Sequence, residues 1–510
     1  YLKGQEVELK MHGNYINDWG ESHPFFYSQF YNLGLAMPRP PFNNPNTTRW
    51  GTFVSGEVDL DAKKITFTDI YGDQTVVSEG LDSIIFYNRY SDARLMTDYC
   101  YVGLYLDTVD PMDSPFMRSL LASDECLGGG GASDHSSKAI DHLMCTPYDS
   151  YSSWNAMYTA IEGCNFAIAN LDNCTIGYSS QAELDDMKGQ AYFLRAYYYY
   201  QLASKYGNIP VYTDNDATVL KYSQSTPKAI WGQILLDLKT AISLMLPEKK
   251  DPSHIKKPDF YYPYGNEDII YPANVDKYAA EAIIGRAWLV YTGFYGNGEN
   301  LADIVSTKYS PLTSVQLPDG TTLTKQNIIS YIDDVVKNSG AKLVPDFRNL
   351  WAYTNRLTVE DYDYTKGQNL EWVENDNGVN PESLFEIQYN TNASWSGAIG
   401  IGMSNLFGLY LGARSIYGAE SFPFGSGWGY GCVCSSFYND WVKAEPNDKR
   451  RDASVNVWSK NQGLGSVSDI PEATDYYNKK LAPIQCKTDK PDTGLSHHNG
   501  NYDRFEFEMY

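Results

Sequence analysis

Long amphipathic segments with clear end signals dominate the middle of the chain. Residues 181–206 carry apolar side chains at three- and four-residue spacing, and Gly207 and Pro210 follow them. Apolar residues at this spacing line one face of an α-helix, while glycine and proline end helices. The same signals predict helices over residues 92–106, 153–171, 227–246, 275–295 and 325–339.

Small residues inside these segments indicate how the helices pack. Ala191, Ala196, Ala280 and Ala287 leave room for a neighbouring helix to come close. Paired helices with short polar connections are typical of helical repeats of the tetratricopeptide type, although no strict repeat period is present here. We therefore expect a mainly α fold: a tetratricopeptide-like helical-repeat scaffold with a large irregular loop-rich part and a few short strands.

The two ends of the chain have a different composition. Residues 1–90 are rich in asparagine, proline, glycine and aromatic residues, and the alternation at 64–68 predicts a strand or hairpin. Residues 341–510 are rich in glycine, asparagine, tyrosine and tryptophan, and residues 381–389 predict a buried strand. We expect an irregular or β-rich extension over 1–90, the scaffold over 91–340, and a loop-rich, ligand-facing part over 341–510.

A run of four glycines, residues 128–131, lies in the stretch from 126 to 153. Four glycines disfavour any regular element, so we expect a long loop over 126–153. Long loops inside a compact domain often have a function, and we assign this one to ligand binding. No Lys-Ser or Lys-Thr pair follows the glycines, which argues against a phosphate-binding loop.

The charge balance argues against several function classes. The chain has 40 Lys and Arg against 63 Asp and Glu, which gives a net charge of −23. This argues against a general nucleic-acid binder and against adhesion to an anionic membrane surface. It also favours neutral glycans or basic peptides over polyanionic cargo. The 43 tyrosines and 11 tryptophans carry rigid rings with a polar tip, which suit sugar or peptide recognition as well as core packing.

The eight cysteines show no zinc-binding spacing. Cys432 and Cys434 lie on one side of a predicted strand, but no histidine pair is near them in the sequence. We expect free or buried thiols, with one or two disulfides as the alternative. Cys126 and Cys145 bracket the glycine run and are the candidate pair for a disulfide.

Several motifs, taken in order along the chain, resemble a known family. They are Trp154-x3-Tyr158-x2-Ile161-x3-Asn165, GQAYFLRAYYY at 189–199, Tyr206-Gly207-x-Ile209-Pro210, YAA-x4-GRAWL at 278–289, ESLFEIQ at 382–388, Gly427-Trp428-Gly429 and Asp448-x-Arg450-Arg451. In order and spacing they resemble the SusD/RagB family, the outer-membrane nutrient-binding lipoproteins of Bacteroidetes-type bacteria. The resemblance extends over residues 91–510.

The resemblance implies a function. It implies a non-catalytic protein that captures a nutrient oligomer at the cell surface and passes it to a SusC-type TonB-dependent transporter. We expect an oligosaccharide as cargo, with a peptide as the alternative and a glycan-processing enzyme as a further one; no catalytic triad, nucleophile elbow or zinc-protease motif is present. Family members carry an N-terminal lipid anchor, so we expect outer-membrane attachment and a chain that is incomplete at both ends.

The candidate ligand contacts are side chains of the two predicted loop regions, because loops carry binding residues more often than helices do. They are Asp134, His135, Asp141 and Tyr148 in the first region, and Trp395, Tyr417, Trp428 and Tyr430 in the second. Trp428 is the strongest candidate since glycines flank it. We expect no cofactor, with a structural calcium ion as an open alternative.

Other conspicuous residues are expected to be structural. Trp154, Tyr158 and Asn165 follow the helical period, and a buried Arg195 needs a carboxylate or carbonyl partner. Asp448, Arg450 and Arg451 are expected to form an ion network or a helix cap.

Overall fold

The structure is a computed structural model. It describes the backbone of strands at 14–16, 22–24, 53–59, 64–69 and 74–77, and it describes residues 90–104, 112, 114–146, 152–174, 180–215, 222–247, 274–296, 300–301, 310–355, 358–373, 380–387, 407–414, 424, 427–457 and 474–482. The chain divides into two compact units, Tyr1–Asn88 and Arg89–Tyr510.

The first unit contains short antiparallel strands. β1 (Asn14–Ile16) pairs with β2 (Ser22–Pro24). β3 (Phe53–Asp59), β4 (Lys64–Asp69) and β5 (Gln74–Val77) form a three-stranded sheet with β4 in the centre. The strand predicted at 64–68 is therefore confirmed.

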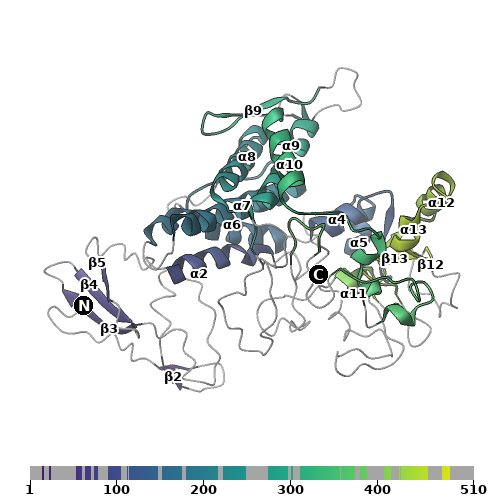
Figure 1. Cartoon of the computed structure of the whole chain (residues 1–510), viewed down its shortest axis with the longest axis horizontal. Helices are drawn as coiled ribbons and strands as arrows, with labels where there is room; N and C mark the ends of the chain where they lie inside the picture. Colours follow the sequence, from purple (N-terminus) through teal and green to yellow (C-terminus); the bar gives the residue numbers. More distant parts are fainter. Residues whose placement is uncertain are drawn as a thin grey trace. The chain divides into compact units, whose positions relative to one another are not determined.

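Long helices that pack against their neighbours in the chain form the scaffold of the second unit. α6 packs against α7, α7 against α8, α8 against α9 and α9 against α10, while α2 packs against both α6 and α7 (Figure 1). Their bounds are α2 (Tyr90–Cys100), α6 (Ser152–Asn170), α7 (Gln181–Tyr206), α8 (Pro227–Leu244), α9 (Lys277–Phe294) and α10 (Lys325–Asn338). The predicted mainly α fold is confirmed. The bounds of α6 to α10 differ by at most two residues from the expected ones, whereas the helix expected over 92–106 ends at Cys100.

Local capping explains why these helices begin and end where they do. The side chains of Thr226 and Asp276 accept hydrogen bonds from backbone N–H groups in the first turns of α8 and α9. At the other end of α7, Gly207 has φ of 73°, a left-handed conformation that favours glycine. These are short-range signals, so the sequence alone locates the ends.

Small and aromatic side chains fill the space between the helices. Ala191, Ala196, Ala280 and Ala287 are all fully buried, as their predicted packing role requires. The buried tyrosines pair their hydroxyl groups with backbone oxygens: Tyr198 donates to Cys100 and Tyr199 to Tyr212, each at 2.6 Å. Trp154 and Tyr158 pack between α6 and α7 with their rings 4.9 Å apart, and the Tyr158 hydroxyl donates to the Pro210 carbonyl. Their structural role is confirmed.

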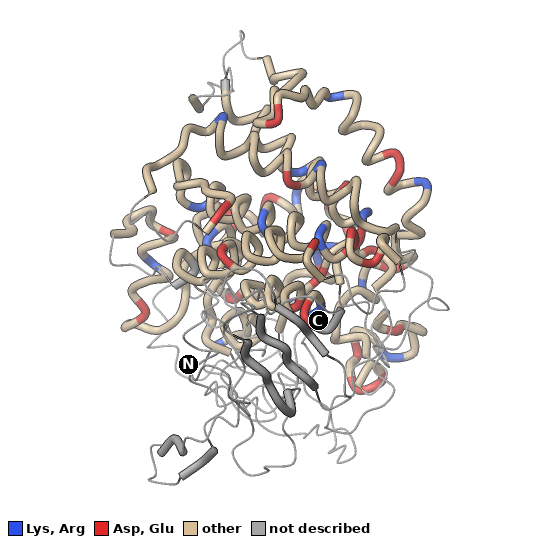
Figure 2. The backbone as a smooth tube through the Cα atoms, turned by 90° about the vertical axis from the view of Figure 1, so that its left-hand side faces the viewer, with Lys and Arg blue, Asp and Glu red and all other residues tan. Residues whose placement is uncertain are grey.

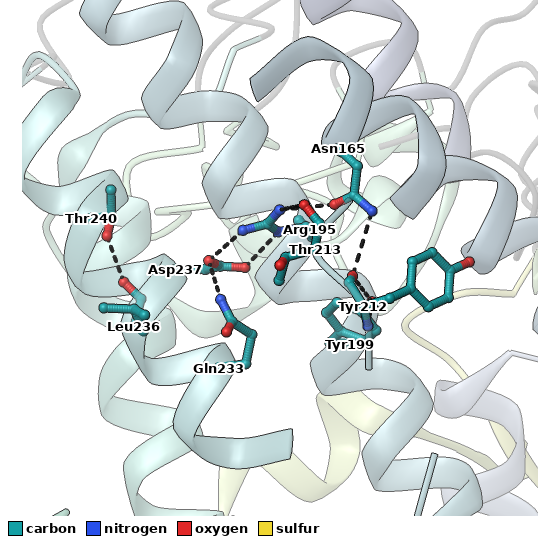
Figure 3. A network of polar contacts seen from close by, with 9 residues as sticks. All are labelled: Asn165, Arg195, Tyr199, Tyr212, Thr213, Gln233, Leu236, Asp237 and Thr240. Atoms are coloured by element: carbon teal, nitrogen blue, oxygen red, sulfur yellow. Dashed lines mark hydrogen bonds and ion pairs between the residues drawn. The ribbon is translucent and has the colours of Figure 1, made fainter. Parts of the chain in front are cut away.

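A buried ion pair joins three helices of the scaffold (Figure 3). Arg195 on α7 donates from Nε and Nη2 to the two carboxylate oxygens of Asp237 on α8, at 2.8 and 2.7 Å. Arg195 Nη1 also donates to Asn165 Oδ1 on α6 at 2.8 Å. The side chains of Arg195 and Asp237 are 3% and 1% exposed. Burial opposes the charge on Arg195, but Asp237 outweighs it and raises the pKa of the guanidinium. The predicted carboxylate partner is thus confirmed.

A second buried charge cluster lies between α9 and α10. Lys277 Nζ is 2.6 Å from Asp334 Oδ2 and 3.3 Å from Glu281 Oε1. The Glu281 side chain is 1% exposed, and its other oxygen has no hydrogen-bond partner among the residues that the structure describes. Burial raises the pKa of Glu281 to about 7, so this carboxyl group holds a proton up to neutral pH.

Short elements build the rest of the second unit. They are α4 (Pro115–Leu121), β6 (Cys126–Gly129), α5 (His135–Asp141), η2 (Leu171–Asn173), β7 (Tyr295–Gly296), β8 (Asn300–Leu301), β9 (Ser314–Gln316), β10 (Thr322–Thr324), η4 (Phe347–Leu350), η5 (Ala352–Thr354), η6 (Val359–Asp361), α11 (Phe407–Leu411), β11 (Tyr430–Val433), α12 (Ser435–Ala444), α13 (Lys449–Ser454), β12 (Val455–Val457) and β13 (Tyr476–Asn478). Asp448 caps α13 by accepting from the Arg450 backbone N–H and also pairs with the Arg450 side chain, as expected.

The glycine run does not form the continuous loop that was expected over 126–153. Its first half lies in strand β6, which pairs antiparallel with β11, and Gly129 is opposite Tyr430. Residues 135–141 form α5. The expectation was wrong because a distant strand supplies the hydrogen bonds that make an extended glycine segment regular, and no local pattern shows that strand. Gly129 and Gly429 have φ of 67° and 75°, and a Cβ on Gly129 would collide with the Gly429 carbonyl oxygen.

A further expectation, the strand at 381–389, and one alternative, the disulfide between Cys126 and Cys145, are wrong, whereas the expected free thiols are confirmed for these two cysteines. Residues 381–387 form turns and irregular backbone instead of a strand, with residues 388–389 lying outside the described part. Cys126 and Cys145 are both free thiols, the first buried at the start of β6 and the second exposed after α5, so no disulfide joins them. Burial raises the pKa of Cys126 to about 12, which keeps it protonated. Among the described residues no helix is long and apolar enough to cross a membrane.

Removing the guanidinium of Arg195 should destabilise the scaffold strongly. Arg195→Met leaves Asp237 as an unpaired buried carboxylate, and we expect the free energy of unfolding to fall by about 3–5 kcal/mol. Lys337→Met is the matched control, because Lys337 and its partner Asp333 are both more than half exposed and should contribute less than about 1 kcal/mol. Urea denaturation followed by circular dichroism measures both. Equal, small effects of the two variants would contradict the structural role of the buried pair.

Glu281 should make the stability depend on pH. Its pKa in the folded protein, about 7, lies above its ordinary value of 4.5, so the folded state keeps a proton that the unfolded chain has released. The proton on Glu281 therefore contributes to the free energy of unfolding. This contribution is complete below about pH 4.5 and is lost as the pH rises through 7. Glu281→Gln keeps the group neutral at every pH. At pH 8 the free energy of unfolding of this variant should exceed that of the natural protein by up to about 3 kcal/mol, whereas at pH 4.5 the two should be similar. Thermal melts at both pH values check this. Glu371→Gln, at an exposed position, is the control and should show no such difference between the two pH values. If the melting temperature of Glu281→Gln changed with pH as that of the natural protein does, the raised pKa of Glu281 would be refuted.

A methyl group on Gly129 should disrupt the pairing of β6 with β11. Gly129→Ala requires an alanine in the left-handed conformation and a shift of the Gly429 carbonyl. We expect the free energy of unfolding to fall by roughly 2 kcal/mol or more. Gly232→Ala in α8 is the control, since the nearest atoms to its Cβ would be Pro318 side-chain carbons at 3.5 and 3.8 Å. It should be neutral or stabilising by up to about 1 kcal/mol. Thermal unfolding compares the two; a Gly129→Ala protein as stable as Gly232→Ala would show that the close approach is absent.

Candidate ligand-binding surface

The ladder of β6 and β11 fixes the position of the candidate surface. Tyr430 is opposite Gly129 and Cys432 is opposite Leu127. Beyond the last strand pair, the Gly130 N–H donates to the Gly429 carbonyl at 3.0 Å. The backbone on both sides of this contact is glycine, so the two segments lie closer than any side chain would permit. Trp428 and Tyr430 therefore project from backbone that is held in place.

A charged pair lies next to this ladder. The Gly131 N–H donates to Asp134 Oδ2 at 2.6 Å, and Arg414 Nη1 lies 3.5 Å from the same oxygen. Arg414 Nη1 also donates to the Trp428 carbonyl at 3.4 Å. The side chains of Asp134 and Arg414 are about one-quarter exposed, at 28% and 26%. They are thus oriented by the backbone and still reach the surface.

Aromatic rings extend the surface away from the charged pair. We call Phe116, Phe407, Tyr410, Trp428 and Tyr430 the aromatic surface. The ring centroids of Tyr410 and Trp428 are 4.7 Å apart, those of Tyr410 and Tyr430 are 5.3 Å apart, and Phe116 meets Phe407 edge to face at 5.3 Å. The rings rest on a buried apolar cluster from α4, α5 and α11: Met117, Leu121, Ile140 and Leu411. Packing of this kind holds each ring in one orientation.

Exposure distinguishes the rings that can meet a ligand from those that support them. Phe116 is 46% exposed, and Trp428, Tyr410 and Phe407 are partly exposed. Tyr430 is only 7% exposed, so its ring supports Trp428 and offers little face of its own. Flat apolar rings beside a carboxylate and a guanidinium match the chemistry of sugars, whose C–H faces stack on rings and whose hydroxyl groups bond to charged side chains.

The structure brings together three of the predicted residues. Trp428 and Tyr430 are neighbours on the ladder, and Asp134 lies beside them, because a Cβ on Gly130 would touch both the Tyr430 ring and Asp134 Oδ2. Asp141 Oδ2 accepts from the Gly128 N–H of β6 at 3.0 Å, so this carboxylate holds the strand. His135 is exposed on α5. Tyr148, Trp395 and Tyr417 lie outside the described residues.

The sequence analysis missed four residues of this surface: Phe116, Phe407, Tyr410 and Arg414. Phe407 and Tyr410 lie three residues apart, a spacing that core helices share, so the pattern alone gave no reason to select them. Phe116 is far along the chain from its partner Phe407. Only the fold shows that these side chains meet.

Charges elsewhere do not gather into a metal site. Acidic and basic positions are interspersed along the described helices (Figure 2). In the described part of the chain, no group of three or more His, Cys, Asp and Glu side chains is arranged to hold a metal ion.

Comparison with known proteins adds sequence and structural evidence. Residues 131–258 match the model of a SusD-like family described as "Starch-binding associating with outer membrane". This segment contains the last residue of the glycine run and the whole of α5, α6, α7 and α8. No curated protein matches the chain.

Several solved structures have a similar fold. A "Laminarin binding SusD-like protein" matches with a TM-score of 0.55 and 17% identity, over 82% of this chain and 76% of that chain. Surface glycan-binding protein A from Bacteroides fluxus matches with a TM-score of 0.56 and 20% identity, over 81% of this chain and 72% of that one. The protein of the same name from Bacteroides thetaiotaomicron, in complex with laminarihexaose, matches with a TM-score of 0.55 and 17% identity, over 81% and 75%. The shared fold and the family match at residues 131–258 together confirm the resemblance to the SusD/RagB family that the motifs predict.

Proposed function

We propose that this chain is a non-catalytic, cell-surface protein that binds an oligosaccharide through the aromatic surface around Trp428. The observation that carries the proposal is the arrangement of Trp428, Tyr410 and Phe116, with exposed ring area, beside the oriented pair Asp134–Arg414. The rings provide stacking faces and the charged pair provides a fixed acceptor and a fixed donor. Side chains held this firmly lose little conformational freedom on binding, which favours affinity.

The comparisons support a glycan as the cargo. The family description names starch, and the similar solved structures are named for laminarin and for surface glycans, one of them with laminarihexaose bound. Tyr148, Trp395 and Tyr417 remain proposed contacts in the same site, together with Asp141 and His135. A peptide is the alternative cargo; it would bind mainly through backbone hydrogen bonds and would depend less on the rings.

The proposed location and partner follow from the family. The chain would be attached to the outer membrane by an N-terminal lipid, and it would deliver its cargo to a SusC-type TonB-dependent transporter. The helical scaffold would supply part of the contact with the transporter. Exposed apolar side chains on α9 and α10, Leu289, Phe294 and Val336, at 70%, 53% and 76% exposure, are consistent with such a contact. The proposal includes no cofactor and keeps a structural calcium ion as the alternative.

Trp428→Ala tests the function directly. Loss of the stacking face should weaken binding of a neutral oligosaccharide at least about tenfold, since truncating a central aromatic side chain commonly costs 1–3 kcal/mol. Trp441→Ala is the matched control: Trp441 lies on α12, packs at the edge of another apolar cluster and is only partly buried. Isothermal titration with a panel of neutral oligosaccharides gives both affinities, and the same samples are assayed for release of reducing ends.

The outcomes separate the candidates. Binding that falls in Trp428→Ala but not in Trp441→Ala, without release of sugar, supports the proposal. Binding of peptides in place of sugars favours the alternative cargo. Turnover of any glycan by the purified protein, or unchanged binding by Trp428→Ala, would count against a non-catalytic site at this surface.

A further inference from the structure

Two consecutive lysines rest on aromatic rings away from the aromatic surface. Lys479 and Lys480 directly follow β13, and the rings belong to η4 and to the segments after it. Lys480 Nζ lies 4.9 Å from the ring centroid of Trp351 and 5.4 Å from that of Phe347. Lys479 Nζ lies 3.3 Å from the ring centroid of Tyr364. We call these five residues the cation–aromatic cluster.

Lys479 is accounted for by the fold. Its side chain is 8% exposed, and its Nζ donates to the Asp452 backbone carbonyl at 2.7 Å. Burial lowers the pKa of Lys479 to about 8. Its hydrogen bond ties the turn after β13 to α13, which fixes the backbone from which Lys480 projects. Lys479 is therefore a positioning residue for its neighbour.

Lys480 differs, because the described residues place no negative group against it. Its side chain is half-buried, and burial lowers the pKa of its ammonium group. Among the described residues no carboxylate lies within 4 Å of it and no acceptor hydrogen-bonds to it; its contacts are with ring faces. Acidic residues outnumber basic ones in this chain, 63 to 40, and other lysines do find carboxylates: Lys188 with Asp172, Lys277 with Asp334, Lys337 with Asp333 and Lys443 with Asp440.

A second donor in the cluster is also unused. The indole N–H of Trp351 is buried and finds no hydrogen-bond acceptor among the described residues. A buried polar group without a partner costs about 1–3 kcal/mol, so this N–H lowers the stability of the cluster as the described residues arrange it. The neighbouring Arg348, by contrast, is satisfied: it pairs with Asp346 at 2.7 Å and donates to Gln368. Within the described residues, Lys480 is thus the one donor of the cluster that reaches the surface without an acceptor, and it lies on partly exposed rings.

We propose that the cation–aromatic cluster is a second glycan-binding site that takes an anionic group of the glycan, a carboxylate or a sulfate ester. Lys480 supplies the positive charge, and the partly exposed rings of Trp351 and Phe347 stack against the sugar that carries the anion. This inference rests on the proposed function, since it names the class of glycan. It also shows how a chain of net charge −23 can bind an anionic cargo: the binding depends on the local charge, and the net charge acts from a distance and is screened by salt.

Matched ligands test the inference. The oligosaccharides are one neutral, one with uronic acids and one with sulfate esters, all of similar length, and an acidic peptide is added. The natural protein, Lys480→Gln, Lys480→Arg and the control Lys443→Gln are titrated with each at low salt. We expect at least one anionic oligosaccharide to bind about tenfold more tightly than the neutral one, because a charge-assisted hydrogen bond of this kind changes affinity by that order. Lys480→Gln should remove this difference, while Lys480→Arg and the exposed Lys443→Gln should keep it.

The readouts distinguish failure of the inference from failure of the proposed function. If neutral and anionic glycans bind equally, or if Lys480→Gln keeps the difference, the inference is overturned while Trp428-dependent binding can still stand. If Lys480→Gln weakens anionic glycans and Trp428→Ala does not affect them, the second site stands and the first fails. Tight binding of the acidic peptide alone would overturn the inference.

A labelling experiment gives a measurement that does not need full-length glycans. The reactivity of Lys480 towards acetic anhydride is followed by mass spectrometry with glucose, glucuronate or inorganic sulfate present. Protection by glucuronate or sulfate, but not by glucose, supports the site when an anionic oligosaccharide also binds. Protection without binding of any oligosaccharide would indicate an adventitious ion only, and equal labelling in all three solutions would refute an anion site at Lys480.

Discussion

The ion pair between Arg195 and Asp237 is the interaction on which the scaffold depends. It lies in the interior, where neither charge has access to water, and it is stable only because α6, α7 and α8 present their polar atoms to one another in a single arrangement. Two helices in apolar contact can slide past each other, but a bidentate hydrogen bond between a guanidinium and a carboxylate permits only one arrangement. The pair therefore sets the relative placement of three helices as well as contributing to their stability, and the neighbouring helices α9 and α10 extend from that fixed group.

The residues of the proposed binding surface also project from backbone that other contacts hold in place. Glycines at 129 and 429 let β6 and β11 come so close that Trp428 and Tyr430 project from a rigid ladder, and Asp134 closes the glycine turn beside them. At the cation–aromatic cluster, Lys479 is immobilised so that Lys480 is presented over two rings. In each place a residue held by hydrogen bonds orients a neighbouring side chain that reaches the surface in part.

The sequence predicted what local signals determine. Gly207 after α7 and the proline that opens α8 located helix ends. The burial of Arg195 required a carboxylate or carbonyl partner, but the sequence did not identify Asp237, 42 residues away, as that partner. The same reasoning failed at the glycine run, because strand β6 exists through its pairing with a segment near the other end of the chain. Trp428 was selected from its flanking glycines, whereas Phe116, Tyr410 and Arg414 belong to the surface only through tertiary contacts. The net charge predicts neutral glycans or basic peptides as cargo, and this stays a prediction, since a composition carries no information about where individual lysines lie.

The pairing of Gly129 with Tyr430 has a consequence for biosynthesis. A ribosome delivers residue 129 long before residue 430, and closing so large a stretch of chain is entropically costly and slow. The helices from α6 to α10 have mostly short-range contacts and can form while the later part is still being made. The proposed binding surface is thus among the last parts to fold, so a nascent or prematurely ended polypeptide would have a folded scaffold without that surface.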